Sequence, residues 1–270
     1  MQFCFFQSKI LKKRFVNLHI IIMMKLVIDI GNTNIKLAVF NFDKIVNLFV
    51  ASKLDFEKIT KQILKNNNQI SKIIISSVSD FNYKFFDEFK NQIKILFLDY
   101  NFKFPFKNIY ETPNTIGLDR LALTSAAFNK FPKKNVLVID VGTCITYDFI
   151  DSNKFYHGGA ISPGLKMRYT SLNQHTKKLP LLVPKSPDNF LGRSTKESIH
   201  SGIVFGIINE IEGMVNLYNY KYNDLVVILT GGDANFLRKQ LKISIFVFSN
   251  FLLEGLNFLL ETNTKRCLKS

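Results

Sequence analysis

The sequence predicts an α/β protein of two related domains, in which sheets are covered by helices, and three observations support this fold class. A motif of strand, Asp-x-Gly turn and second strand occurs twice, once in each half of the 270-residue chain. Apolar runs typical of strands alternate with segments of helical periodicity. Apolar residues make up 47% of the sequence, so a chain of this length can bury a large core without disulfide bonds.

The repeat consists of residues 26–33, which read LVIDIGNT, and residues 137–143, which read LVIDVGT. A second apolar stretch and a polar turn follow each copy. We interpret each copy as a strand, a tight turn and a second strand. Because the copies lie half the chain apart, they predict two related domains that face each other, at residues 24–132 and 133–270.

The other elements are predicted from apolar periodicity and capping signals. Further strands are expected at residues 44–50, 72–77, 94–98, 225–230 and 243–248. Helices are expected at residues 55–66, 81–91, 117–130, 234–241 and 251–262. Ser194 and Glu197 fit a capping box that opens a long helix, with apolar residues at helical spacing as far as Val215. Residues 157–164 contain three glycines and a proline, which we interpret as a shaped loop with His157 on its surface.

Residues 1–23 precede the first predicted strand and are expected to lie outside the fold. Their two apolar clusters flank a basic patch at residues 12–14, and neither approaches the ~20 apolar residues of a spanning helix. No cleavage site typical of a signal peptide follows. Translation could also start at Met23 or Met24, and an amphipathic membrane tether is the alternative interpretation of this segment.

The net charge of +15 comes from 36 Lys and Arg against 21 Asp and Glu. The basic residues are scattered in short pairs, which favours a solvated basic surface over a nucleic-acid footprint. The three cysteines, Cys4, Cys144 and Cys267, are widely separated, so neither a zinc site nor a disulfide framework is expected. A reduced, cytoplasmic protein that binds no membrane and no nucleic acid is the simplest interpretation.

The loop after the first strand carries residues suited to phosphate binding. Gly31 permits a sharp turn, and the side chains of Asn32 and Thr33 can then face a phosphate. Asp29 ends a buried strand, where it could hold Mg²⁺ through water, and Lys36 is near enough to add positive charge. A plain hairpin is the alternative for one copy. Two copies favour phosphate binding, because an Asp at the end of a hydrophobic strand carries a desolvation cost.

Two other motifs have simpler alternatives. The Gly231-Gly232 turn can bring a helix start close to a ligand, or merely separate a strand from a helix. Asp119, in the first turn of a predicted helix, is explained by the helix dipole, and Arg120 beside it by a surface ion pair.

Five motifs in order, between Met24 and about Leu260, resemble the type III pantothenate kinase family within the actin, hexokinase and heat-shock chaperone superfamily. They are MKLVIDIGNTN at 24–34, YETPNTIGLDR at 110–120, DVGT at 140–143, GGAISPG at 158–164 and GRST at 192–195. The resemblance implies two duplicated actin-like (ribonuclease H-like) domains with mixed sheets flanked by helices. It places the nucleotide site in the cleft between them. Two departures are Cys144, where Ala is expected, and the first 23 residues, which have no counterpart.

The resemblance also implies an activity and a set of site residues. The family transfers the γ-phosphate of ATP to the terminal hydroxyl of pantothenate, the first step of coenzyme A synthesis. It uses Mg²⁺ or another divalent cation, requires a monovalent cation such as K⁺ or NH₄⁺, and forms homodimers. Asp119 would accept the proton, Asp29 would lie near the divalent metal and Asp140 would bind the monovalent cation. The residues implied for ATP are Asp29, Ile30, Gly31, Asn32, Thr33, Asn34, Ile35, Lys36 and Thr143. Those implied for pantothenate are Tyr110, Gly117, Leu118, Asp119, Arg120 and Thr195.

Three alternative functions stay open. A related phosphotransferase could act on another small alcohol, and a non-enzymatic regulator could use the same fold. A DNA-binding protein is disfavoured, because no recognition-helix pattern accompanies the basic charge. The intact Asp29, Asp119, Asp140 and Thr143 disfavour the regulator.

Overall fold

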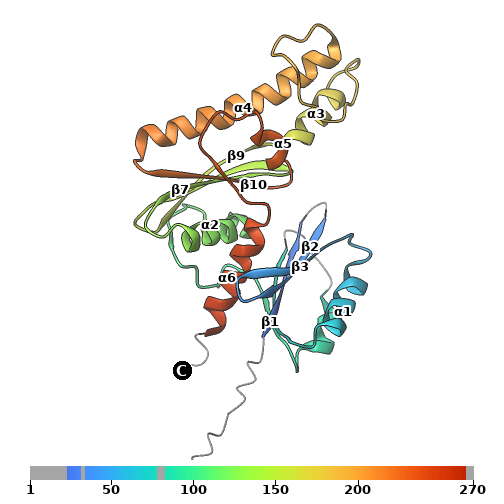
Figure 1. The fold of residues 1–270 in the computed structure, drawn as a ribbon, viewed down its shortest axis with the longest axis vertical. Helices are drawn as coiled ribbons and strands as arrows, with labels where there is room; N and C mark the ends of the chain where they lie inside the picture. The colour runs from blue at the N-terminus through green and yellow to red at the C-terminus, as the bar shows by residue number, and fades with distance from the viewer. Residues whose placement is uncertain (1–22, 32–33, 78–82, 266–270) are drawn as a thin grey trace, which may run out of the picture.

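The computed structural model describes residues 23–31, 34–77 and 83–265, which form two sheets with helices on their faces (Figure 1). The first sheet has the order β3-β2-β1-β4-β5. Its strands are β1 (Met24–Ile30), β2 (Ile35–Asn41), β3 (Lys44–Ala51), β4 (Ile70–Ser77) and β5 (Lys94–Phe97). β1 pairs antiparallel with β2 and parallel with β4, so the sheet is mixed.

The second sheet has the order β11-β10-β7-β8-β9-β6. Its strands are β6 (Lys107–Asn108), β7 (Asn135–Val141), β8 (Cys144–Ile150), β9 (Phe155–Pro163), β10 (Leu225–Thr230) and β11 (Phe246–Val247). β7 pairs antiparallel with β8 and parallel with β10. This sheet is mixed in the same way as the first.

The two sheets repeat one topology, as the sequence repeat predicts. The series β3-β2-β1-β4-β5 corresponds to β9-β8-β7-β10-β11, with the same antiparallel and parallel pairings at each step. The central strands also share one burial pattern, in which only the first residue and the Asp are less than fully buried. The mixed sheets and duplicated α/β architecture are confirmed.

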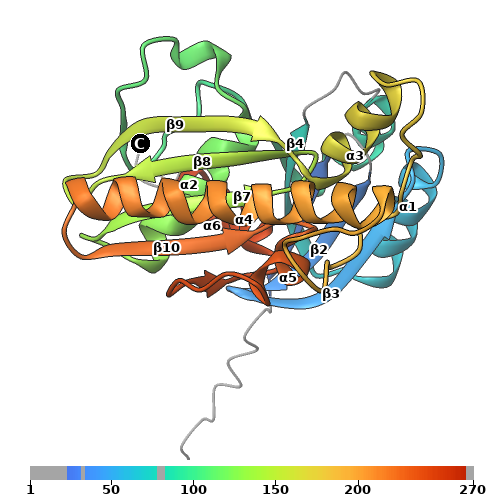
Figure 2. The same ribbon diagram turned by 90° about the horizontal axis from the view of Figure 1, so that it is seen from above.

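Helices cover both faces of each sheet, because both central strands are apolar almost throughout. The helices are α1 (Phe56–Asn66), α2 (Leu118–Lys130), α3 (Leu165–Gln174), α4 (Thr195–Lys221), α5 (Ala234–Arg238) and α6 (Phe251–Lys265). The 3-10 helices are η1 (Lys84–Phe89) and η2 (Pro113–Thr115). Leu26 and Ile28 pack with α1 and η1, whereas Val27 between them packs with α6. Figures 1 and 2 show α4 lying along the second sheet, with α2 on the opposite face.

The last helix returns to the first half of the chain. α6 packs on α2 and against β1 and β4, where Lys25 Nζ lies 3.2 Å from Glu261 Oε1. β6, from the first half of the sequence, pairs with β9 in the second sheet. Segments from each half therefore contact the sheet of the other, and the domain division at residue 132 stays a prediction.

Most predicted elements are present, with differences in length or type at some segments. The strand expected at 243–248 is only the two-residue β11, and the helix expected at 81–91 is the shorter η1. The segment 157–164, interpreted as a loop, is mostly strand β9, which corrects that prediction. β9 contains glycines at positions where neighbouring groups occupy the space that a side chain would fill. Within the described part of the chain, no helix is long and apolar enough to cross a membrane.

Candidate active site

The two repeated hairpin turns lie at one large cavity between the sheets. The first turn is closed by Gly31 N, which donates to Asn34 O at 3.2 Å, and the second by Gly142 N, which donates to Cys144 O at 3.0 Å. The cavity has a volume of about 730 Å³. Its wall includes four residues of the first hairpin and three of the second: Asp29, Gly31, Asn34, Lys36, Asp140, Gly142 and Thr143.

Asp29 and Asp140 occupy equivalent positions in the two hairpins, and both side chains line the cavity. Burial raises the pKa of Asp29 to about 7, helped by the negative charges of Asp119 and Asp140 and opposed by Lys36. Burial likewise raises the pKa of Asp140 to about 7, with Asp119 adding to the effect and Lys36 opposing it. Neither carboxylate accepts a hydrogen bond or forms an ion pair within the described residues. These carboxylates therefore suit a bound cation.

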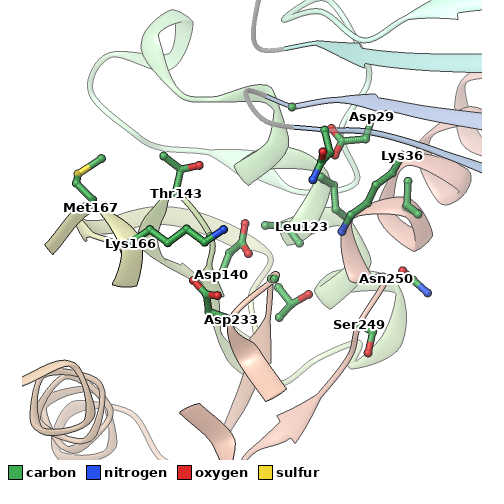
Figure 3. Close-up of a pocket in the computed structure, with 18 of the residues that line it drawn as sticks. Asp29, Lys36, Leu123, Asp140, Thr143, Lys166, Met167, Asp233, Ser249 and Asn250 are labelled. Atoms are coloured by element: carbon green, nitrogen blue, oxygen red, sulfur yellow. The ribbon is translucent and has the colours of Figure 1, made fainter. Parts of the chain in front are cut away.

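The Gly-Gly turn after β10 forms another part of the wall, as the ligand-binding interpretation of that motif expects. Gly231, Gly232 and Asp233 line the cavity beside the second hairpin. Asp233 N donates to Val141 O at 3.0 Å, which ties this turn to the end of β7. Ser249 and Asn250, just before α6, complete this side (Figure 3).

Asp119 lies near the cavity without lining it. It is half-buried in the first turn of α2, where its Oδ1 accepts a hydrogen bond from Arg120 N at 2.9 Å. Its charge contributes to the raised pKa values of both Asp29 and Asp140, so the three carboxylates are close enough to interact electrostatically. Asp119 Oδ2 accepts no hydrogen bond from another described residue, which leaves it available for a proton.

Arg120 is buried, which corrects the interpretation of it as part of a surface ion pair. Only 5% of its surface is exposed, and Asp148, which is 1% exposed, lies 2.8 Å from its Nη2. Tyr156 OH donates to the same Asp148 oxygen at 2.6 Å. The guanidinium therefore already has a carboxylate partner inside the protein.

Tyr110 lies against the start of the glycine-rich part of β9. Gly158 has φ +84°, and a Cβ there would come within 2.4 Å of Tyr110 Cδ2. Only glycine fits both the backbone conformation and the space beneath the ring. The second and fourth motifs of the family resemblance are therefore in contact, although they lie far apart in the sequence.

Thr195 is the first residue of α4, and the serine half of the predicted capping box is confirmed, whereas Glu197 bonds one residue before the N-cap. Ser194 Oγ accepts a hydrogen bond from Glu197 N at 3.3 Å, and Glu197 Oε2 accepts one from Arg193 N at 2.7 Å. Thr195 is exposed and is absent from the cavity wall.

The structure separates the implied ATP residues into three groups. Those that line the cavity are Asp29, Gly31, Asn34, Lys36 and Thr143. Ile30 and Ile35 are fully buried in the sheet, where they shape the hairpin without facing the cavity. Asn32 and Thr33 lie outside the described residues.

The implied pantothenate residues Tyr110, Gly117, Leu118, Asp119 and Arg120 are all absent from the wall of this cavity. Tyr110 and Leu118 instead pack partly against the core between α2 and the second sheet. The wall also includes residues that the motifs did not indicate, among them Lys166 at the start of α3. The available signal was the Pro-Gly pair that precedes the helix.

The carboxylates at this cavity fit a divalent cation that is also held by the phosphates of a substrate. The described residues contain no group of three or more His, Cys, Asp or Glu side chains that could enclose a metal ion. Mg²⁺ is usually held by one or two carboxylates together with substrate phosphates and waters. Two half-buried carboxylates with raised pKa values at the edge of a large cavity match this requirement.

The family model and the curated relatives that match this chain all carry the same description. The family model for type III pantothenate kinase matches residues 25–217. The chain is 49% identical to the type III pantothenate kinase of Christiangramia forsetii, covering 89% of this chain and 99% of that one. It is 46% identical to that of Flavobacterium psychrophilum, covering 88% and 99%.

Solved structures show the same fold at lower identity. A Baf family transcriptional activator from Campylobacter jejuni has a TM-score of 0.56 at 23% identity, covering 89% of this chain and 99% of that one. The activator of 2-hydroxyisocaproyl-CoA dehydratase from Clostridium difficile has a TM-score of 0.53 at 12% identity, covering 92% and 97%.

Proposed function

The chain belongs to the type III pantothenate kinase family, and we propose that its two repeated hairpins form the ATP site of this activity. The enzyme phosphorylates pantothenate to 4'-phosphopantothenate, the first step of coenzyme A biosynthesis. The observation that carries the assignment is the meeting of Asp29 and Asp140 at one cavity, with Lys36 in the same wall.

The nucleotide site combines positive charge with cation-binding carboxylates. Lys36 and the hairpin turns would contact the phosphates, with Thr143 on the second turn. Asp29 would hold Mg²⁺ through water, and the metal would neutralise charge on the phosphates when bound. Phosphoryl transfer depends mainly on such positioning and charge neutralisation, so the protein needs little covalent chemistry of its own.

Asp119 is the proposed proton acceptor. As a bond forms between the pantothenate hydroxyl oxygen and the γ-phosphorus, the bond from that phosphorus to the bridging oxygen of ADP breaks. The hydroxyl proton passes to Asp119, whose Oδ1 is held by Arg120 N. A positioned general base typically contributes about 10²–10⁴-fold to the rate.

The pantothenate site would lie around Tyr110 and the start of α2, with Gly117 and Leu118 beside the base. Arg120 would act there chiefly by fixing Asp119, because its guanidinium is paired with Asp148. A role for Arg120 as the partner of the pantothenate carboxylate is therefore less favoured than the sequence motif alone suggests.

Two further features of the proposal concern the monovalent cation and the oligomer. Asp140 would bind K⁺ or NH₄⁺, a role supported by its raised pKa and by its lack of an ion-pair partner within the described residues.

We also propose a homodimer that acts in the cytoplasm. Thr195 is exposed, and Phe190 and Leu191, which precede it in the sequence, are 77% and 61% exposed, so this segment offers apolar area to a second copy. In such a dimer Thr195 could contact pantothenate bound to either copy.

The test is ATP consumption by the purified protein with pantothenate and Mg²⁺, with and without K⁺. K⁺-dependent turnover with 4'-phosphopantothenate as product is the expected result. Turnover that does not depend on K⁺ would remove the role given to Asp140. A protein that binds ATP without turning over pantothenate would direct the search to other small alcohols, and a protein that binds no ATP would contradict the site.

A further inference from the structure

Lys166 lies in the wall of the cavity, outside every motif that identifies the family. It is the second residue of α3, and its side chain is exposed. Figure 3 shows that this side chain extends into the cavity from the α3 side, whereas Lys36 enters from the β2 side. The two lysines therefore approach the same space from different halves of the chain.

Among the residues that the structure describes, the ammonium group of Lys166 has no hydrogen-bond partner and no ion-pair partner within 4.0 Å. Asp233 interacts electrostatically with Lys166: burial raises the pKa of Asp233 overall, and the positive charge of Lys166 partly opposes this increase. An unpaired cation that faces a cavity of this size can accept an anionic group of a ligand.

Contacts of the neighbouring residues Gly164 and Arg168 fix the backbone at Lys166. Gly164 N donates to Thr143 O at 3.1 Å, and a Cβ at Gly164 would meet Gly142 O at 2.2 Å. The start of α3 therefore lies directly against the second hairpin turn. Arg168 Nε donates to Pro163 O at 2.9 Å, and the guanidinium also pairs with Glu210 of α4. The start of α3 is therefore held both by the second hairpin turn and by α4.

We propose that Lys166 binds the polyphosphate of the nucleotide, opposite Lys36. The inference rests on the proposed ATP site and adds a residue to it. Its location at the N-terminal turn of α3 strengthens the attraction, because the helix dipole and the unpaired first-turn N–H groups also favour negative charge. The two lysines would then hold the phosphates from both walls while Asp29 and Asp140 bind cations.

The test is the affinity of Lys166→Met for a ligand series that differs only in phosphate number. Adenosine, AMP, ADP and a non-hydrolysable ATP analogue would be titrated against the wild type and the variant with Mg²⁺ present. Methionine keeps the length of the side chain and removes its charge, and Lys177→Met is the matched control at an exposed position outside the cavity. Lys166→Arg tests whether charge alone restores binding.

The affinity of Lys166→Met for adenosine should be unchanged. Its affinity should fall about tenfold for the shortest ligand of the series that carries the phosphate contacted by Lys166. Lys177→Met should leave the whole series unchanged, and Lys166→Arg should recover most of the loss. An equal loss for all four ligands, or no loss for any, would overturn the role of Lys166 while the ATP site stands. A wild-type chain that binds none of the phosphorylated ligands would overturn this inference together with the proposed function.

Discussion

Arg120, in the first turn of α2, and Asp148, in the middle of β8, form a buried ion pair that joins the helix carrying the proposed base to the second sheet. Arg120 Nε and Nη2 lie 2.9 Å and 2.8 Å from Asp148 Oδ1. Burial raises the pKa of Asp148, and the charge and hydrogen bonds of Arg120 oppose this effect. Asp119 Oδ1 accepts a hydrogen bond from Arg120 N, so the proposed base contacts the backbone of the residue whose side chain forms the ion pair.

Removing one partner of this pair should cost much more stability than removing both. Asp148→Ala leaves a buried guanidinium without its carboxylate, a change that typically costs about 3–5 kcal/mol. The apparent Tm should fall by roughly 2–4 °C for each kcal/mol lost in a protein of this size. The double variant Arg120→Met/Asp148→Met should recover at least half of that fall, as measured by thermal unfolding. Strictly additive losses would show that the two residues do not act as a pair.

Asp119→Asn should lower turnover by at least tenfold while ATP binding is retained, because asparagine cannot accept the hydroxyl proton. Steady-state rates and nucleotide titration of the same preparation separate the two effects. The amide can still accept the hydrogen bond from Arg120 N, so the helix start should be preserved. Near-normal turnover would remove Asp119 from the role of base.

Gly158→Ala should weaken pantothenate binding more than ATP binding. A methyl group there would overlap the ring of Tyr110 and would also strain a backbone with φ +84°. Displacement of Tyr110 is expected to raise the KM for pantothenate on the order of tenfold, because small misplacements of positioning residues have large effects. Gly202→Ala is the control, since a Cβ there meets nothing within 4 Å. Equal effects on the KM values for both substrates would contradict a separate pantothenate site at Tyr110.

The fold could be predicted where sequence signals are local and repeated. Apolar runs and a glycine turn indicate each of the two Asp-x-Gly hairpins in the sequence. Both hairpins are present in the structure, with matching register. β9 could not be predicted, because its glycines normally mark loops. They are required by groups that approach from elsewhere, such as Tyr147 O, which would lie 1.8 Å from a Cβ at Gly159.

The sequence indicates part of the candidate site, for the same reason. Asp29 and Asp140 are candidates because each lies at the end of a hydrophobic strand, where an unpaired carboxylate is costly. The partner of Arg120 could not be found, since it depends on α2 lying against β8. The Pro-Gly pair before α3 indicates a helix start near Lys166, but only the packing of α3 on the second hairpin turn brings the lysine to the cavity.

Deletion of residues 1–23 should leave pantothenate phosphorylation unchanged. The family match begins at residue 25, and β1 begins at Met24. Specific activity and thermal unfolding of the shortened protein would be compared with those of the full chain. Loss of active, folded protein would show that this segment contributes to the fold.

Asp29 and Asp140 should each make a contribution that lowers the stability of the metal-free protein as the pH rises from about 4 to about 7. The pKa values of Asp29 and Asp140 are raised to about 7 in the folded state, whereas an unfolded Asp titrates near 3.9. Between these values the folded state holds protons that the unfolded state has lost, so raising the pH favours unfolding. Above about pH 7 both carboxylates are charged and the full penalty is present.

Asp140→Asn should therefore raise the Tm of the chelator-treated protein at about pH 8 and leave it nearly unchanged at about pH 4. The exposed Asp188→Asn controls for the loss of one negative charge and should change neither Tm. Adding Mg²⁺ and K⁺ at the higher pH should stabilise the wild type more than Asp140→Asn, because the cations then neutralise the charge that the substitution removes. If the Tm of Asp140→Asn is at or below that of the wild type at both pH values, the Asp140 carboxylate stabilises the metal-free fold. That result would contradict its proposed role as a cation ligand that is destabilising without the cation.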